Sequence, residues 1–200
     1  MTRDIGQATS LAADCSRRPS RRTFLALSGA LLTTLPAGTA AARAIVPPAP
    51  PAPRTKTLGF LHRHTGEEVK ATYWTNGDYL GDGVAEIAHL LRDWRTEEVA
   101  PIDVKLLDFL FDIRTSLQSD APFHVVSGYR SPKTNAMLAS KSKRVAKNSL
   151  HMQGMAVDVK LPGRKLSAVR RVARQLRRGG VGYYPRSGFL HLDVGPVRAW

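Results

Sequence analysis

Two short segments in the C-terminal half of the chain constrain its fold most, because together they carry three potential metal ligands. The first segment, residues 149–158, places His151 and Asp158 on either side of a turn of small residues. In the second, residues 189–193, apolar and polar residues alternate, which predicts a strand with His191 on its polar face. A fold that uses all three side chains must bring the two segments to one place.

The three residues form a donor set that suits zinc. Two imidazoles and one carboxylate are typical of catalytic zinc sites, which keep a fourth position open for water. Taken singly, each residue has an ordinary explanation: a solvated loop histidine, a capping aspartate and an unrelated strand histidine. The combination favours a metal site, and we predict one Zn²⁺ per chain, held at the sheet by His151, Asp158 and His191. With only one anionic ligand the metal stays positive, so it can acidify water and polarise a carbonyl.

The same residues carry a family resemblance. The pattern Ser-x-His-x6-Asp, followed by a histidine on a strand, resembles the zinc D-Ala-D-Ala carboxypeptidase superfamily and, within it, the murein endopeptidase K family. Residues 127–135, 179–185 and 191–198 are also similar to that family, and the likeness covers about Leu58 to Trp200. It implies a zinc metallopeptidase, of the D,D-/L,D-endopeptidase or carboxypeptidase type, that hydrolyses peptidoglycan stem-peptide cross-links in cell wall remodelling.

Two further residues are candidates for contact with substrate. Arg130 follows a predicted strand and a Ser-Gly pair, and its guanidinium is suited to an anionic tetrahedral intermediate or to a substrate carboxylate. The resemblance implies the same role, and the alternative is a surface arginine in a tight turn. Ser149 either holds a substrate carboxylate or caps the loop that carries His151.

The sequence departs from the family resemblance at the position of the general base. Many superfamily members have a glutamate three residues before the last zinc histidine, but Gly188 stands there in this chain. Strand alternation puts Asp193 on the same face as His191. We therefore expect Asp193 to be the base, the alternative being that it orients an imidazole. The remaining histidines are expected to be structural: His62, His64, His89 and His124.

The N-terminal part of the chain is predicted to be an export signal and not part of the folded domain. Residues 1–44 hold a twin-arginine motif at Arg21-Arg22, a short apolar stretch and the small-residue cleavage site Ala42-Arg43-Ala44. The apolar stretch is shorter than the roughly 20 residues that span a bilayer, so we expect no transmembrane span in the mature protein. These features predict a periplasmic protein exported by the twin-arginine route. Residues 45–57 are expected to be a proline-rich linker, and residues 58–200 the zinc peptidase catalytic domain.

Composition excludes some chemistry and leaves one further alternative. The single cysteine, Cys15, lies in the signal segment, which removes cysteine-protease chemistry and disulfides from the mature chain. Without residues 1–44 the chain keeps 24 basic and 14 acidic side chains, a net charge of +10. This charge suits a polyanionic partner such as peptidoglycan. Much of it lies in residues 164–178, an expected helix with a basic, solvated back. In the absence of a nucleic-acid motif we expect no nucleic-acid partner.

Periodicity predicts an α+β fold: a single domain with a small, mainly antiparallel sheet and helices packed on one side. The expected strands are residues 58–62, 69–74, 123–126, 155–161, 181–184 and 189–194, the first two and the last two forming hairpins. The expected helices are residues 84–94, 102–117, 132–140 and 164–178, the last one stopped by Gly179-Gly180. We expect a monomer that acts on peptidoglycan stem peptides. The alternative is a non-catalytic peptidoglycan-binding module that keeps the fold without the base.

Overall fold

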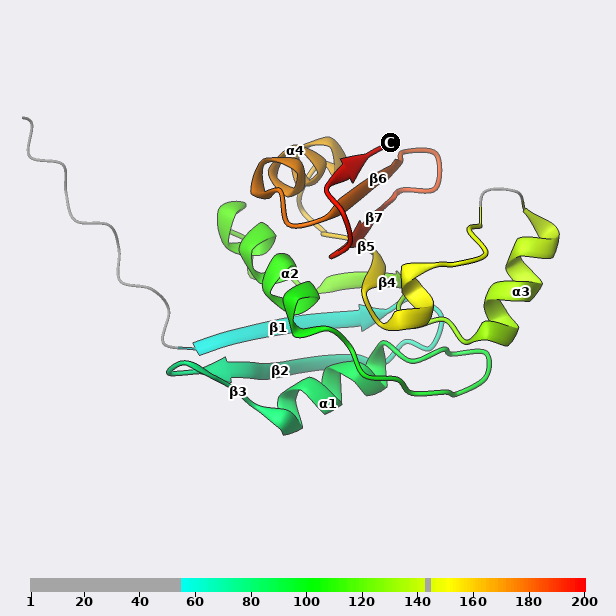
Figure 1. The fold of residues 1–200 in the computed structure, drawn as a ribbon. Coiled ribbons are helices and arrows are strands. Elements are labelled where there is room, and N and C mark those ends of the chain that lie inside the picture. The colour runs from blue at the N-terminus through cyan, green and yellow to red at the C-terminus, as the bar shows by residue number, and fades with distance from the viewer. Residues whose placement is uncertain (1–54, 143–144) are drawn as a thin grey trace, which may run out of the picture. The chain divides into compact units, whose positions relative to one another are not determined.

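The computed structural model describes residues 55–142 and 145–200, which form an α+β domain (Figure 1). The expected signal segment, most of the linker and Cys15 lie outside the described residues. The strands are β1 (Thr55–His62), β2 (Glu68–Thr75), β3 (Asp78–Tyr79), β4 (Phe123–Ser127), β5 (Ala156–Lys160), β6 (Gly180–Tyr184), β7 (Phe189–Asp193) and β8 (Arg198–Ala199). The helices are α1 (Gly81–Leu90), α2 (Val104–Ser116), α3 (Pro132–Lys141), the short 3₁₀ helix η1 (Leu150–Gln153) and α4 (Leu166–Leu176).

All the strands belong to one sheet, in the order β3-β2-β1-β4-β5-β7-β6-β8. Its pairings are antiparallel except for β1 with β4 and β6 with β8. Both expected hairpins, β1/β2 and β6/β7, are present, and the expected fold class is confirmed. The two-residue strands β3 and β8 were not anticipated. They extend the sheet at its two edges, so it is larger than expected.

Strand alternation gives the two faces of the sheet different tasks. On β5 and β7, Val157, Val159, Leu190 and Leu192 are fully or almost fully buried in the hydrophobic core. The residues between them, including Asp158, project from the opposite face because side chains alternate along a strand. The central strands therefore stabilise the domain with one face and present the candidate ligands on the other.

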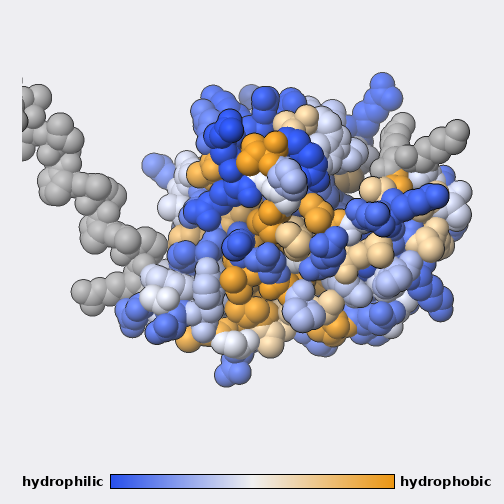
Figure 2. All heavy atoms as spheres, viewed as in Figure 1, coloured by the Kyte–Doolittle hydropathy of each residue, from blue (hydrophilic) through white to orange (hydrophobic). Residues whose placement is uncertain are grey.

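Three helices cover the core face. Buried residues of α1, α2 and α4, including Ile87, Leu110 and Val169, belong to the same hydrophobic cluster as the strand residues. The outer side of α4 is basic and exposed, as expected, and Figure 2 shows hydrophilic side chains gathered over this helix. Among the described residues, no helix is long and apolar enough to cross a membrane.

Helix α3 adds no residue to the core, but it supports the segment that leads to the site. Pro132 occupies its first turn, and the Ser131 hydroxyl accepts a hydrogen bond from the Thr134 amide. A proline in the first turn and a serine N-cap both favour the start of a helix. The side-chain amide of Asn135 donates to the carbonyls of Ala146 and Lys147, at 3.1 and 3.2 Å. These bonds fix the chain just before the loop of the candidate ligands.

Several expected boundaries were wrong. Strand β1 begins at Thr55 and not at Leu58, so its first three residues lie in the segment expected to be linker. Helix α1 ends at Leu90, not at Trp94, because the Leu91 carbonyl accepts the Tyr129 amide at 2.6 Å and the chain turns to support the loop of Arg130.

The end of α4 differs as well. Arg177, not a glycine, adopts the left-handed conformation after the helix, with φ of 51°. Gly180 instead begins β6, where a Cβ atom would lie 2.3 Å from the Asp193 carboxylate. The glycine pair is thus needed for close approach to Asp193 and not for ending the helix.

Candidate metal centre

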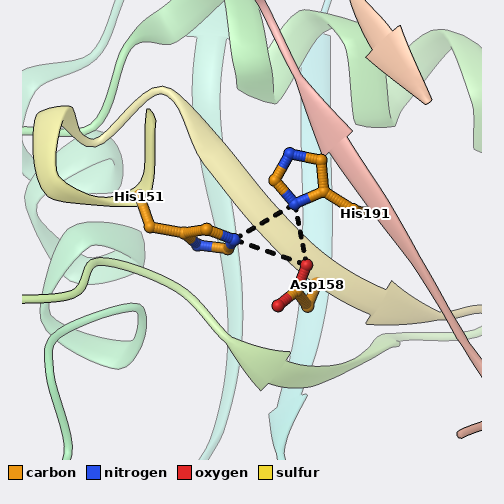
Figure 3. Close-up of side chains that lie close together, drawn as sticks. All are labelled: His151, Asp158 and His191. Atoms are coloured by element: carbon orange, nitrogen blue, oxygen red, sulfur yellow. Dashed lines mark hydrogen bonds and ion pairs between the residues drawn. The ribbon is translucent and has the colours of Figure 1, made fainter. Parts of the chain in front are cut away.

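The three predicted ligands meet on the face of the sheet opposite the core (Figure 3). Asp158 on β5 and His191 on β7 are direct cross-strand partners. His151 reaches them from η1, whose first amides are capped by the Ser149 hydroxyl, which accepts from the His151 amide at 3.4 Å. Capping, one of the two roles considered for Ser149, is thus observed, and Ser149 also lines the adjoining cavity.

The ligand atoms have the spacing that a small divalent cation requires. His191 Nδ1 lies 2.9 Å from Asp158 Oδ1 and 3.1 Å from His151 Nε2, and His151 Nε2 lies 3.4 Å from Asp158 Oδ1. Neighbouring ligands of a tetrahedral zinc with bonds of about 2.0–2.1 Å are about 3.3 Å apart. The donor set and its spacing therefore fit zinc, and they do not fit calcium, which prefers six to eight oxygen ligands at longer range.

The tautomer of each histidine is set by a partner on its far side. His151 Nδ1 lies 2.7 Å from the Gly128 carbonyl oxygen, which only accepts, so Nδ1 carries the proton and Nε2 faces the cluster with its lone pair. His191 Nε2 lies 3.1 Å from Asp193 Oδ2, which leaves Nδ1 as the atom aimed at the cluster. Partners of this kind orient metal-binding histidines.

Several hydrogen bonds fix the position of the Asp193 carboxylate, which contacts His191. Its side chain is fully buried, and its Oδ1 accepts from the amides of Gly180 and Gly195 at 3.1 and 2.9 Å. The Arg198 guanidinium donates to both carboxylate oxygens, at 3.1 and 2.7 Å. These donors, with His191, outweigh burial and lower the pKa of Asp193 to about 2. The carboxylate is thus ionised and fully engaged.

The electrostatics of the cluster attract a cation. Burial would raise the pKa of Asp158, but electrostatic interactions and hydrogen bonds with His151 and His191 outweigh it and hold that pKa well below its usual range. Burial likewise would lower the pKa of His191, yet Asp158 and Asp193 raise it to about 9. Two carboxylates that retain a proton this strongly on an imidazole provide a favourable environment for a metal ion, which would take the place of that proton.

Arg130 lies at the edge of the cluster. One of its terminal nitrogens is 3.4 Å from Asp158 Oδ2 and 3.2 Å from the Ser127 hydroxyl. Its side chain is only 11% exposed, burial lowers its pKa, and its Nε has no hydrogen-bond partner. Arg130 is therefore a largely buried arginine beside the candidate ligands and not a surface arginine in a turn.

A cavity of about 300 Å³ opens beside the three ligands. Arg130 and Ser149 line it together with His151, Asp158 and His191. The remaining lining residues are Leu138, Val145, Ala146, Asn148, Leu150, Tyr184, Phe189, Arg198 and Trp200. The histidines expected to be structural are absent from this lining, and His62 supports the β1–β2 turn, where its Nδ1 accepts the amides of His64 and Thr65.

The aromatic wall of the cavity was not predicted from the sequence. Phe189 lies two residues before His191 on β7, so strand alternation places both side chains on the same face. This alternation was the sequence signal that could have predicted Phe189 in the cavity lining. Tyr184 is its cross-strand partner, and their rings stack at 4.8 Å. Trp200 reaches the site through β8, whose two residues carry no periodicity that predicts a strand.

Comparison with known sequences identifies the family. Residues 50–200 match the family described as peptidoglycan L,D-endopeptidase MepK. The chain belongs to this family. Peptidoglycan L,D-endopeptidase MepK of Escherichia coli strain K12 is 40% identical over 181 residues, which are 90% of this chain and 97% of the relative. Probable peptidoglycan L,D-endopeptidase MepK of Haemophilus influenzae is 40% identical over 149 residues, 74% of this chain and 80% of the relative. The family resemblance in the sequence is thereby confirmed.

In this member of the MepK family, the position of the expected glutamate is a turn residue. Gly188 lies between β6 and β7 with φ of +74°, a conformation that disfavours any residue with a side chain. Among the described residues that line the cavity, Asp158 is the only carboxylate. Asp193 contacts the nitrogen of His191 that faces away from the cluster. This arrangement favours the orienting role of Asp193 over the role of base.

Proposed function

We propose that the protein is a zinc-dependent peptidoglycan endopeptidase that hydrolyses stem-peptide cross-links during cell wall remodelling. The convergence of His151 Nε2, Asp158 Oδ1 and His191 Nδ1 beside an open cavity supports this proposal most directly. The relatives named as peptidoglycan L,D-endopeptidases supply the substrate class. The reaction adds water across a peptide bond, so the carbonyl carbon gains oxygen and the amine departs with a proton.

His151, Asp158 and His191 would hold the zinc ion. When bound, zinc supplies Lewis acidity, which favours ionisation of water and polarises the scissile carbonyl. Asp193 keeps the proton of His191 on Nε2 and so leaves Nδ1 free for the metal. The Gly128 carbonyl does the same for His151.

Arg130 and Ser149 are proposed to contact the substrate. Arg130 lines the cavity, and its guanidinium charge suits a carbonyl oxygen that becomes negative or a substrate carboxylate. The Ser149 hydroxyl accepts one amide as a cap and still has a proton to donate into the cavity that it lines. Peptidoglycan stem peptides carry carboxylates that match both groups.

The proposed place of action rests on sequence features before the first strand. Residues 1–44 are proposed to direct export by the twin-arginine route, and the proline-rich residues that follow to link the signal to the domain, whose first strand begins at Thr55. A monomer in the periplasm would then meet peptidoglycan directly. The proposed bond is the cross-link between two meso-diaminopimelate units, as the family resemblance implies, and the relatives are named L,D-endopeptidases.

Digestion of purified sacculi tests this function. The mature protein with zinc should release soluble muropeptides that mass spectrometry assigns to cleaved cross-links, and a chelator should stop the release until zinc is restored. Defined muropeptides with one kind of cross-link each then identify the bond. Binding to sacculi without any release in zinc would contradict the enzyme and support the non-catalytic module.

A further inference from the structure

Tyr184 is a polar side chain in the cavity to which the site described above assigns no role. It ends β6, and its side chain lines the same cavity as Arg130 and His191. The phenol oxygen accepts a hydrogen bond from the indole Nε1 of Trp200 at 3.0 Å. The Trp200 ring in turn lies 5.5 Å from the ring of His191. The Trp200 side chain therefore contacts both the Tyr184 hydroxyl and the candidate ligand His191.

In this hydrogen bond the indole is the donor and the phenol oxygen is the acceptor. An indole N–H donates and never accepts, so the tyrosine oxygen must use a lone pair for it. Its own proton remains available, and no described residue accepts it. A phenol whose lone pair is used and whose proton is free acts as a hydrogen-bond donor to whatever binds in the cavity.

The surrounding strands hold this arrangement rigidly. The backbone of Trp200 makes two hydrogen bonds to β6: its amide donates to the Val181 carbonyl at 3.2 Å, and its carbonyl accepts from the Tyr183 amide at 3.0 Å. Gly182 makes room for the indole, because a Cβ atom there would lie 2.8 Å from two of its ring carbons. Stacking on Phe189 also supports the tyrosine ring.

We propose that the Tyr184 hydroxyl donates a hydrogen bond to the oxygen of the scissile carbonyl as that oxygen becomes negative, alongside Arg130. This inference rests on the proposed peptidase function. No proton leaves the phenol: water adds to the carbonyl carbon, the carbon–nitrogen bond breaks, and the amine takes the proton. Trp200 is a positioning residue, since it acts through the tyrosine.

The first test is Tyr184→Phe, which removes the hydroxyl and keeps the ring. Loss of one donor to an oxyanion lowers kcat by about a hundredfold or more. The KM for a defined muropeptide and the zinc content should stay at wild-type values. Tyr183→Phe is the matched control: it removes a hydroxyl from the neighbouring position of β6, outside the cavity lining, and should keep wild-type kcat.

A second measurement reads the interaction without turnover. A phosphinate pseudopeptide, in which phosphorus replaces the scissile carbonyl carbon, carries the oxyanion permanently. Its dissociation constant should rise in Tyr184→Phe by a factor similar to the loss in kcat, and remain unchanged in Tyr183→Phe. Trp200→Phe, which removes the indole N–H, should weaken inhibitor binding less than Tyr184→Phe, because the phenol is still present but no longer oriented.

The outcomes separate this inference from the proposed function. A wild-type protein that releases no peptide defeats the function itself. An active wild-type protein whose Tyr184→Phe variant keeps full kcat and full inhibitor affinity overturns the donor role alone. Loss of zinc from Tyr184→Phe would also overturn it, because the tyrosine would then support the metal site instead.

Discussion

At the scale of single residues, the distinction that matters most is between the two roles open to Asp193. Alternation along β7 correctly predicts that Asp193 shares a face with His191. What the sequence does not contain is the direction of the imidazole, which turns Nε2 toward Asp193 and Nδ1 toward the cluster. That direction depends on donors from Gly180, Gly195 and Arg198, which tertiary packing brings to the carboxylate.

Asp193→Asn distinguishes the two roles. Because the carboxylate orients His191, we expect zinc affinity to fall by about ten- to a hundredfold, with turnover largely recovered at saturating zinc. Metal titration and kinetics on the same variant measure both quantities. Normal zinc affinity with turnover reduced by two to four orders of magnitude, roughly the range for loss of a general base, would restore the role of base.

Arg130→Ala tests the second residue-scale assignment. The substitution removes a buried donor that contacts Asp158 through only one 3.4 Å bond, so zinc should stay bound. Loss of an oxyanion donor predicts a fall in kcat of about a hundredfold. Arg95→Ala, which changes an exposed arginine that does not line the cavity, is the control. Wild-type turnover in Arg130→Ala would reduce Arg130 to a turn residue.

At the scale of secondary-structure elements, periodicity predicted the elements that pack and failed where loops or edges serve the site. The apolar repeats of α2 and α4 match observed helices because those faces are buried. The same repeat continues through Leu91 into Trp94, yet α1 stops at Leu90 because the next carbonyl binds the loop of Arg130. A long-range hydrogen bond of this kind has no local signal.

Asp108 is a polar link between α2 and the first strands, and its ionisation makes stability depend on pH. It accepts from Lys56 at 2.7 Å, Tyr73 at 3.0 Å and Tyr79 at 2.6 Å. Burial opposes ionisation, but these three bonds outweigh it and lower the pKa of Asp108 below its usual value. Stability from this ionised carboxylate is therefore present above about pH 4 and lost as the pH falls through the folded-state pKa.

Asp108→Asn should cost about 2–4 kcal/mol of unfolding free energy at pH 7, since it removes one charge from a largely buried group. The difference from wild type should shrink as the pH is lowered from about 4. Urea unfolding across this range measures both effects. Asp112→Asn is the control: its pair with Arg178 is more exposed, so about 0–1 kcal/mol is expected. Equal costs for the two variants would contradict the assignment.

At the scale of the whole molecule, one face of the sheet packs on the hydrophobic core and the opposite face presents the candidate ligands. The sequence predicted the fold class because alternation and helical repeats report which faces are buried. It also predicted that His151, Asp158 and His191 lie together, since each belongs to a short local pattern that carries the family resemblance. It did not predict the aromatic wall of Tyr184 and Trp200, which depends on β8 joining β6 in parallel at the sheet edge. Such a pairing is decided by tertiary contacts alone.

The most direct test of the account is the zinc content of the purified mature protein and of its His151→Ala variant, measured by elemental analysis with folding checked by circular dichroism. His124→Ala, on the same side of the sheet but outside the cluster, serves as the control. One zinc per chain in the wild type and in His124→Ala, with none retained by a folded His151→Ala protein, is the predicted result. Full zinc occupancy in His151→Ala would contradict the metal centre and, with it, the proposed mechanism.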